Sequence, residues 1–357
     1  MFNLVIQTAF IGDLFLSIPL MRRIKKKFPD MPLVLFCRRG LGDLFKDLKL
    51  IDQFIEIDKS DRKSWKEAKH KLIKNQYHWI VSSHQSFRTA CIVAQLKAQK
   101  KIGFLNWWNF WAYSHRVKRP MQWPDALRQL SLMSDFDQEL AKNLQDIRVN
   151  KKFLNTHAAQ DMINNESIPP WASLSVLSEI RNQNLHNNEF IIPTPYICLM
   201  PGSVWPTKRW PASSYADLAQ RLISTGLTVV LLGAQEDDEV CREVAQAHQG
   251  IINLCGQTSL YNSLFILSRA EFAVSNDSGT QHMATAVEVP LVSVFGPTTL
   301  DLGYRPWGEK VRVVEKPLSC RPCGLHGARV CPIGTHECMK SINPREVQRT
   351  LKDLYSI

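Results

Sequence analysis

The chain contains no apolar run long enough to cross a bilayer, and this argues against a membrane-spanning protein. Its apolar beginning also lacks the basic start of a signal peptide. Asp13 interrupts that stretch, and the basic cluster Arg22–Lys27 follows it instead of preceding it. The cysteine count is odd, nine in 357 residues, which favours a reducing compartment. We therefore expect a cytoplasmic protein whose chain begins with a strand and a helix.

No known nucleic-acid-binding module is present, and no Gly-x-Gly-x-x-Gly fingerprint follows the first strand pattern, Leu4–Thr8. The net charge of +11 nevertheless favours an acidic partner. Nucleic acid, an anionic membrane surface and a phosphorylated substrate all satisfy that charge. A basic nucleic-acid-binding protein is therefore kept as the alternative from another functional class.

Strand and helix patterns alternate along both halves of the chain, which is typical of doubly wound α/β domains with parallel sheets. Residues 166–195 are rich in proline and asparagine and predict a linker with a helical middle, Leu174–Arg181. We predict an N-terminal domain over residues 1–165 and a C-terminal domain over 196–340. A final helix within 341–357 is expected to pack back onto a domain surface.

The stretch from Glu271 to Pro297 organises the second half. A buried strand begins at Phe272, a turn follows, and a helix over Thr280–Val287 leads to a second strand. The first backbone amides of a helix have no partner within the helix and favour an anion. Ser278, Gly279 and Thr280 are thus candidates to hold a phosphate or diphosphate. Helix capping alone is the competing interpretation.

Three strand ends of the second half carry polar residues that parallel strands would bring to one edge of the sheet. Ser203 and Lys208 follow one strand, Glu236 follows the next, and Asp277–His282 follow a third. Lys208, the Ser203 hydroxyl and the helix amides suit a diphosphate, whereas Glu236 suits ribose hydroxyls. Taken singly, Lys208 and Glu236 also fit solvated surface charges.

In the first half, Asp13 stands where a strand meets a helix and is the candidate general base. Ser86 and Arg88 lie at another strand end. An aromatic run, Trp107–Tyr113, has basic flanks. Such rings pack, stack on nucleobases or rest on a membrane, and we take membrane contact as a hypothesis.

Several of these motifs resemble those of the glycosyltransferase family 9 heptosyltransferases of lipopolysaccharide inner core synthesis. They are Thr8–Leu14, Pro201–Pro211, Leu232–Glu236, Asn276–Thr285 and Phe295–Thr298. The resemblance implies a GT-B fold, with two Rossmann-like domains facing each other across a cleft. It also implies inverting, metal-independent transfer of heptose from ADP-L-glycero-D-manno-heptose to a Kdo/heptose-lipid A acceptor. Another nucleotide sugar, or a related epimerase activity, is the alternative.

The resemblance also implies residue roles. Asp13 is the base, Lys208 stabilises the departing ADP, Glu236 holds the ribose, and the segment from Asp277 to His282 cradles the diphosphate and the donor sugar. Family acceptors carry Kdo carboxylates and phosphates on a lipid. Arg88, with Ser86 beside it and the basic segment 59–74, is therefore expected on the acceptor side. The enzyme is expected to associate peripherally with the anionic cytoplasmic face of the inner membrane, and no cofactor is expected.

Four cysteines crowd the end of the chain, namely Cys320, Cys323, Cys331 and Cys338. Such thiolates can bind zinc tetrahedrally, although the second pair is not Cys-x-x-Cys. We expect free buried thiols in a loop-rich tail, with structural zinc as the alternative. A similar tail occurs in the second-heptose branch of the family, which favours that branch.

Overall fold

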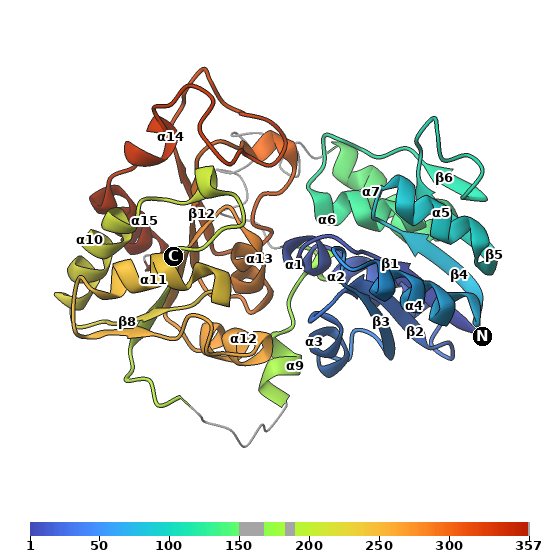
Figure 1. The fold of residues 1–357 in the computed structure, drawn as a ribbon, viewed down its shortest axis with the longest axis horizontal. Coiled ribbons are helices and arrows are strands. Elements are labelled where there is room, and N and C mark those ends of the chain that lie inside the picture. Colours follow the sequence, from blue (N-terminus) through green and yellow to red (C-terminus); the bar gives the residue numbers. More distant parts are fainter. Residues whose placement is uncertain (150–167, 183–189, 356–357) are drawn as a thin grey trace. The chain divides into compact units, whose positions relative to one another are not determined.

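The computed structural model describes residues 1–149, 168–182 and 190–355, and these fall into two compact units (Figure 1). Unit 1 contains the residues before 150 together with Ile168–Leu174, and unit 2 contains the described residues from Ser175 onward. The predicted boundary at residue 165 and part of the predicted linker lie outside the described residues.

Unit 1 contains a parallel sheet of six strands in the order β3-β2-β1-β4-β5-β6. The strands are β1 (Phe2–Ile6), β2 (Leu33–Arg38), β3 (Gln53–Ile57), β4 (Gln76–Ser82), β5 (Lys97–Phe104) and β6 (His115–Val117). The helices are α1 (Ile11–Phe15), α2 (Ile18–Lys27), α3 (Gly42–Asp47), α4 (Arg62–Ile73), α5 (Phe87–Gln95), α6 (Asp125–Leu130) and α7 (Gln138–Val149).

Unit 2 repeats this plan with a second parallel sheet of six strands, in the order β12-β11-β10-β7-β8-β9. The strands are β7 (Tyr196–Met200), β8 (Thr228–Leu231), β9 (Ile251–Asn253), β10 (Phe272–Asn276), β11 (Leu291–Phe295) and β12 (Val311–Glu315). The helices are α9 (Leu177–Asn182), α10 (Ala212–Ile223), α11 (Asp238–Ala245), α12 (Leu260–Ser268), α13 (Gly279–Ala286), α14 (Glu337–Lys340) and α15 (Pro344–Tyr355).

The central strands are apolar on both faces because helices cover both sides of each sheet. In unit 1, Leu4 and Ile6 pack toward Ala68 of α4 and Val93 of α5. Val5, which alternates with them along β1, is fully buried as well. In unit 2, the outer helix α15 packs against α10 and β12, and it buries Val347, Leu351 and Leu354 in the core.

Each sheet contains one point at which the strand order reverses. In unit 1 the reversal lies between β1 and β4, and in unit 2 it lies between β7 and β10. Ligands of open α/β sheets bind outside the carboxyl ends of the strands at such points. The doubly wound α/β prediction is therefore confirmed, and the two reversals indicate where each unit should carry its site.

Two sequence expectations are corrected by the structure. The single helix expected after the first strand is two helices, because Leu16 and Ser17 separate α1 from α2 and Pro19 lies in the first turn of α2. Strands β5, β6 and β12 were missed. Strand β5 lacks a continuous apolar run because it contains Lys97, Lys100 and Lys101. These lysines are tolerated because the first half of the strand is exposed or only partly buried.

Candidate functional site

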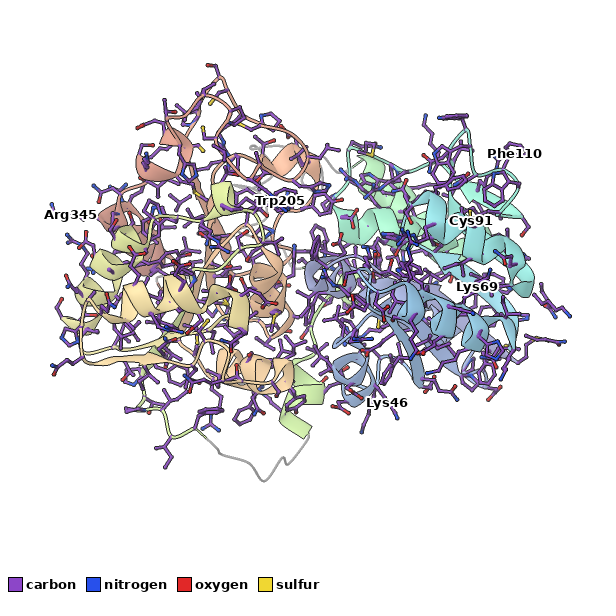
Figure 2. The ribbon with its side chains drawn as sticks, in the orientation of Figure 1. Lys46, Lys69, Cys91, Phe110, Trp205 and Arg345 are labelled. Carbon is purple, nitrogen blue, oxygen red and sulfur yellow. The ribbon has the colours of Figure 1, made fainter. Side chains whose placement is uncertain are left out.

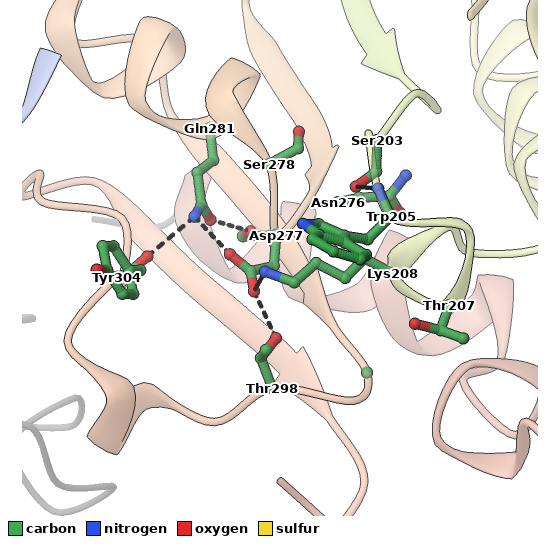
Figure 3. Close-up of polar contacts among 12 residues, drawn as sticks. Ser203, Trp205, Thr207, Lys208, Asn276, Asp277, Ser278, Gln281, Thr298 and Tyr304 are labelled. Atoms are coloured by element: carbon green, nitrogen blue, oxygen red, sulfur yellow. Dashed lines mark hydrogen bonds and ion pairs between the residues drawn. The ribbon is translucent and has the colours of Figure 1, made fainter. Parts of the chain in front are cut away.

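The reversal point of unit 2 holds a buried ion pair. Lys208 ends a short 3-10 helix, η4 (Pro206–Lys208), that follows β7, and Asp277 follows β10. Lys208 Nζ lies 2.6 Å from Asp277 Oδ2, and the two side chains are only 11% and 5% exposed. Thr298 Oγ1 donates to the same carboxylate oxygen at 2.5 Å. A lysine held this way presents its positive charge in a fixed place (Figure 3).

Gln281 completes the support of Asp277. Its Nε2 donates to Asp277 Oδ1 at 3.0 Å and to the Tyr304 carbonyl at 3.0 Å. Its Oε1 accepts from Ser293 Oγ of β11 at 2.6 Å. Both carboxylate oxygens of Asp277 are thus engaged (Figure 3). This geometry suits the carboxylate to holding Lys208 in position, because its negative charge would repel an anionic diphosphate.

Asn276 ties the two strand ends together. Its Nδ2 donates to the Pro201 carbonyl at 2.7 Å, and its Oδ1 accepts from the Trp210 backbone N–H at 3.0 Å and from the Tyr215 hydroxyl at 3.2 Å. The residue is fully buried, so all of these bonds are made away from water. Asn276 therefore fixes the loop that carries Lys208 beside the end of β10.

Helix α13 begins directly beside this pair. Ser278 is its N-cap residue, but its side chain makes no capping hydrogen bond to the helix backbone. Instead its Oγ lies 2.7 Å from Thr280 Oγ1. The capping-only interpretation is therefore not supported, and the first amides, from Gly279 on, remain suited to an anion. His282, in the same helix, is buried with its Nε2 3.5 Å from Gln281 Nε2.

Ser203 follows β7, and Glu236 follows β8, the strand beside β7 in the sheet. Ser203 Oγ accepts from the Trp205 backbone N–H at 3.3 Å. Glu236 is exposed on η5 (Gln235–Asp237), which follows β8. The loops after β7 and β8 are in close contact, because a Cβ at Gly202 would lie 2.1 Å from the Asp237 carboxyl carbon.

The reversal point of unit 1 carries Asp13, near the start of α1. Its Oδ2 accepts from the Phe10 backbone N–H at 3.2 Å. Burial and the neighbouring carboxylate of Asp125 raise the pKa of Asp13 to about 7, from an ordinary 3.8. A carboxyl that titrates near neutrality has the basicity that a general base needs.

Asp125 is fixed by its own partners. It pairs with Arg119, and Gln129 Nε2 donates to its Oδ2 at 2.7 Å. The same Gln129 Nε2 also donates to the Asp13 carbonyl at 3.1 Å. No sequence signal indicated Asp125 or Gln129, because α6 lies more than a hundred positions from α1 and only the fold brings the two helices together.

Three cations stand at the neighbouring strand ends of unit 1. Arg38 ends β2, Lys59 follows β3, and Arg88 lies in the first turn of α5. Burial, and then the charge of Arg38, lower the pKa of Lys59; Arg88 also lowers it, whereas Asp13 opposes the shift. Arg38 was missed, although the strand-end rule that found Asp13 also applies to it. Lys59 belongs to the basic segment 59–74 that was expected on the acceptor side.

The Arg88 guanidinium lies over the Trp65 ring, 4.8 Å from its centroid. Ser86 is the N-cap of α5, and its Oγ accepts from the Thr89 backbone N–H at 3.1 Å. Capping therefore accounts for the Ser86 hydroxyl, whereas Arg88 remains the polar group of this strand end that suits an acceptor.

The aromatic run divides into two parts. Tyr113 is buried, whereas Trp107 is 89% exposed and Phe110 65%. Phe110 stands at the outer margin of unit 1 in Figure 2. Phe87 of α5, itself 63% exposed, lies with its ring centroid 5.9 Å from those of Trp108 and Trp111. Packing thus explains part of the run and leaves an exposed aromatic patch at the carboxyl edge of the sheet.

The family model for glycosyltransferase family 9 (heptosyltransferase) matches residues 65–330. The chain belongs to glycosyltransferase family 9. It is therefore a glycosyltransferase, and the nucleic-acid-binding alternative loses its support. Within the described ranges, no helix of this family 9 chain is long and apolar enough to cross a membrane.

Similar proteins span the full length of this family 9 chain. Lipopolysaccharide heptosyltransferase 2 of Salmonella typhimurium is 25% identical and covers 99% of the chain and 97% of its own length. The structure of Escherichia coli ADP-heptose lipopolysaccharide heptosyltransferase II matches with a TM-score of 0.73 at 24% identity, over 99% of this chain and 98% of that one. A family 9 glycosyltransferase from Veillonella parvula matches with a TM-score of 0.74 at 18% identity, over 99% and 96%. The expected GT-B fold is confirmed.

Proposed function

We propose that this enzyme transfers heptose from ADP-L-glycero-D-manno-heptose to the inner core of lipopolysaccharide, with inversion and without a metal ion. The proposal rests above all on the buried Lys208–Asp277 pair beside the start of α13. Relatives named as lipopolysaccharide heptosyltransferases over the full chain length support it. Their name, heptosyltransferase 2, favours the second-heptose branch, for which the proposed acceptor is a Kdo/heptose-lipid A molecule.

On the donor side, the diphosphate would lie against Lys208 and the first amides of α13. Negative charge develops on the departing ADP, and a preorganised cation and helix amides stabilise that charge in place of a metal. Asp277 holds Lys208 in position, and the Ser203 hydroxyl adds a donor. Glu236 would accept hydrogen bonds from the ribose hydroxyls, and His282 would lie toward the donor sugar.

On the acceptor side, Asp13 would take the proton of the attacking hydroxyl. The hydroxyl oxygen bonds to the anomeric carbon as the bond from that carbon to the ADP oxygen breaks. Attack from the face opposite ADP inverts the configuration. The pKa of about 7 leaves a large part of Asp13 ionised at neutral pH while keeping it a competent base. Arg38, Lys59 and Arg88 would bind the acceptor's carboxylates and phosphates.

A thermal-shift comparison of ADP, UDP, GDP and CMP, each with its sugar conjugates, tests the donor assignment. Selective stabilisation by ADP and ADP-heptose is expected, because ligands that bind only the folded state raise its melting temperature. Selective stabilisation by UDP or GDP would replace the donor while keeping the mechanism. Mass spectrometry of an inner-core acceptor incubated with ADP-heptose would then detect the heptose added.

The enzyme would meet its lipid-linked acceptor at the cytoplasmic face of the inner membrane. The exposed aromatic patch adjoins the acceptor strand end, since Asn106 Nδ2 lies 3.4 Å from Gln85 Oε1. Aromatic rings favour the membrane interface, and nearby cations favour anionic lipid. Replacing Trp107 and Phe110 by Ser should reduce flotation with anionic liposomes. Ile73→Ser, an exposed apolar residue at the end of α4, is the control. Unchanged flotation of the double variant would rule out this docking.

A further inference from the structure

The connection between β12 and α14, residues 316–336, contains no helix or strand. Irregular connections of this length are uncommon in compact domains and usually carry a function. Hydrophobic burial holds only its beginning, where Leu318 packs against the core of unit 2. Leu325, Val330 and Ile333 are 66%, 77% and 59% exposed. We call residues 316–338 the cysteine segment, since it contains four of the nine cysteines.

All four of these cysteines line one small cavity of about 10 Å³. A cavity of that size accommodates one occupant of about the size of a water molecule. The cysteines arrive from three places along the chain: the Cys320/Cys323 pair, Cys331, and Cys338 on α14. Residues distant along an irregular segment thus bring the same soft, metal-binding side chain to a single point.

Two glycines with positive φ follow cysteines of the segment. Cys323 is followed at once by Gly324 with φ +101, and Cys331 is followed three positions later by Gly334 with φ +77. A Cβ would meet nothing within 4 Å at either glycine, so backbone conformation and not crowding requires glycine there. The His336 backbone N–H points at Cys331 Sγ, 3.4 Å away.

We propose that Cys320, Cys323, Cys331 and Cys338 together bind one tetrahedral metal ion, zinc or iron(II). Four sulfur ligands in tetrahedral arrangement select these metals. Each thiol loses its proton on binding, so four protons are released and the dipositive ion with four thiolates carries a charge of −2. Four protein ligands leave no open position, which makes the site structural and leaves the transfer reaction free of metal chemistry.

The side chains must turn inward for this. As they stand, no group of three or more His, Cys, Asp or Glu within the described ranges meets the spacing of a metal centre. Metal–sulfur bonds of about 2.3 Å draw thiols from a cavity wall to its middle. The expectation of buried thiols holds for Cys338, which packs in the core of unit 2. It does not hold for Cys320, Cys323 and Cys331, which are only partly buried.

The cysteine segment supports both sides of the Lys208–Asp277 pair. The Cys323 backbone N–H donates to the Pro297 carbonyl at 2.8 Å, next to Thr298. His336 Nε2 lies 2.7 Å from the Thr207 carbonyl, next to Lys208. A metal ion that fixes the segment would therefore also fix the loops that place the ion pair.

Metal content of the purified protein, measured by inductively coupled plasma mass spectrometry, tests the proposal. About one equivalent of zinc or iron per chain is expected, and the element found separates the two metals. Cys320→Ser and Cys331→Ser should each lose most of it. Cys91→Ser is the matched control, because Cys91 is a partly buried cysteine of unit 1 (Figure 2) and should keep the full content.

A second measurement does not depend on the variants folding. Wild-type protein is stripped with a chelator under reducing conditions and titrated with cobalt(II). The visible bands of a tetrahedral tetrathiolate site should appear with one equivalent and disappear on adding zinc. Metal-free wild-type protein as isolated, together with no tetrahedral cobalt spectrum, would overturn the proposal. Weaker ADP binding after metal removal would test the link to the donor site separately, because only that link rests on the proposed function.

Discussion

The two units share one architecture, yet the charged groups at their reversal points differ in sign and in environment. In unit 2 the charged group is Lys208, buried and locked by Asp277. In unit 1 it is Asp13, a carboxyl near one carboxylate, Asp125, and near several cations. The first arrangement fixes a positive charge permanently, and the second adjusts the pKa of a base toward neutrality. Under the proposed function, the same fold would stabilise the leaving group in one unit and accept a proton in the other.

The largest expected effect comes from removing the base. Asp13→Asn should lower kcat by about 10²–10⁴-fold, the usual contribution of general base catalysis, with ADP affinity unchanged. Steady-state transfer assays and calorimetric ADP titration measure the two quantities. Asp43→Asn, the same change in the first turn of α3, is the control and should be neutral. Near-full turnover of Asp13→Asn would show that unit 1 does not carry the base.

Breaking the locked pair in unit 2 should affect both catalysis and stability. Lys208→Met should lower kcat by about 10²–10³-fold. It should also lower the free energy of unfolding by about 3–5 kcal/mol, because Asp277 is left buried without its partner. Urea unfolding and transfer assays measure the two effects.

The double variant Lys208→Met/Asp277→Asn separates these roles. Removing both charges should restore most of the lost stability without restoring turnover, because no charge then remains unpaired and no cation faces ADP. Recovery of turnover in the double variant would contradict the assigned role of Lys208.

The raised pKa of Asp13 predicts the pH dependence of transfer. A base must be ionised to accept a proton, so kcat/KM should rise with pH through about 7 and level off above it. Asp125→Asn removes a negative neighbour, which should lower the pKa of Asp13 and move this limb to lower pH. The pH profiles of kcat/KM for the wild-type protein and Asp125→Asn provide the measurement. If the acidic limb does not move, a group other than Asp13 causes it.

The smallest expected effect comes from trimming the support of Asp277. Thr298→Val removes one hydrogen bond to the carboxylate and should cost about 1.5–3 kcal/mol of stability. Lys208 stays paired, so turnover should fall by roughly tenfold or less. Urea unfolding and kcat measure this. A loss of turnover as large as that of Lys208→Met would mean that Thr298 contacts the substrate itself.

The sequence by itself determined the parallel α/β class and most strand ends, because buried parallel strands are continuous apolar runs followed by turns. Strand β10 begins at Phe272, as predicted. Asp13, Lys208 and Asp277 were found for the same reason, since each follows an apolar run. The charged strand β5 escaped because its lysines interrupt the apolar run that marks a buried strand.

Only the tertiary structure decided what each of these residues contacts. The pairing of Lys208 with Asp277 joins positions far apart in the chain, and Asp125 reaches Asp13 only because α6 folds back beside α1 and α2. Local pattern carries information about neighbours along the chain, whereas pKa values and ion pairs depend on neighbours in space. The gathering of four cysteines around one cavity has the same origin.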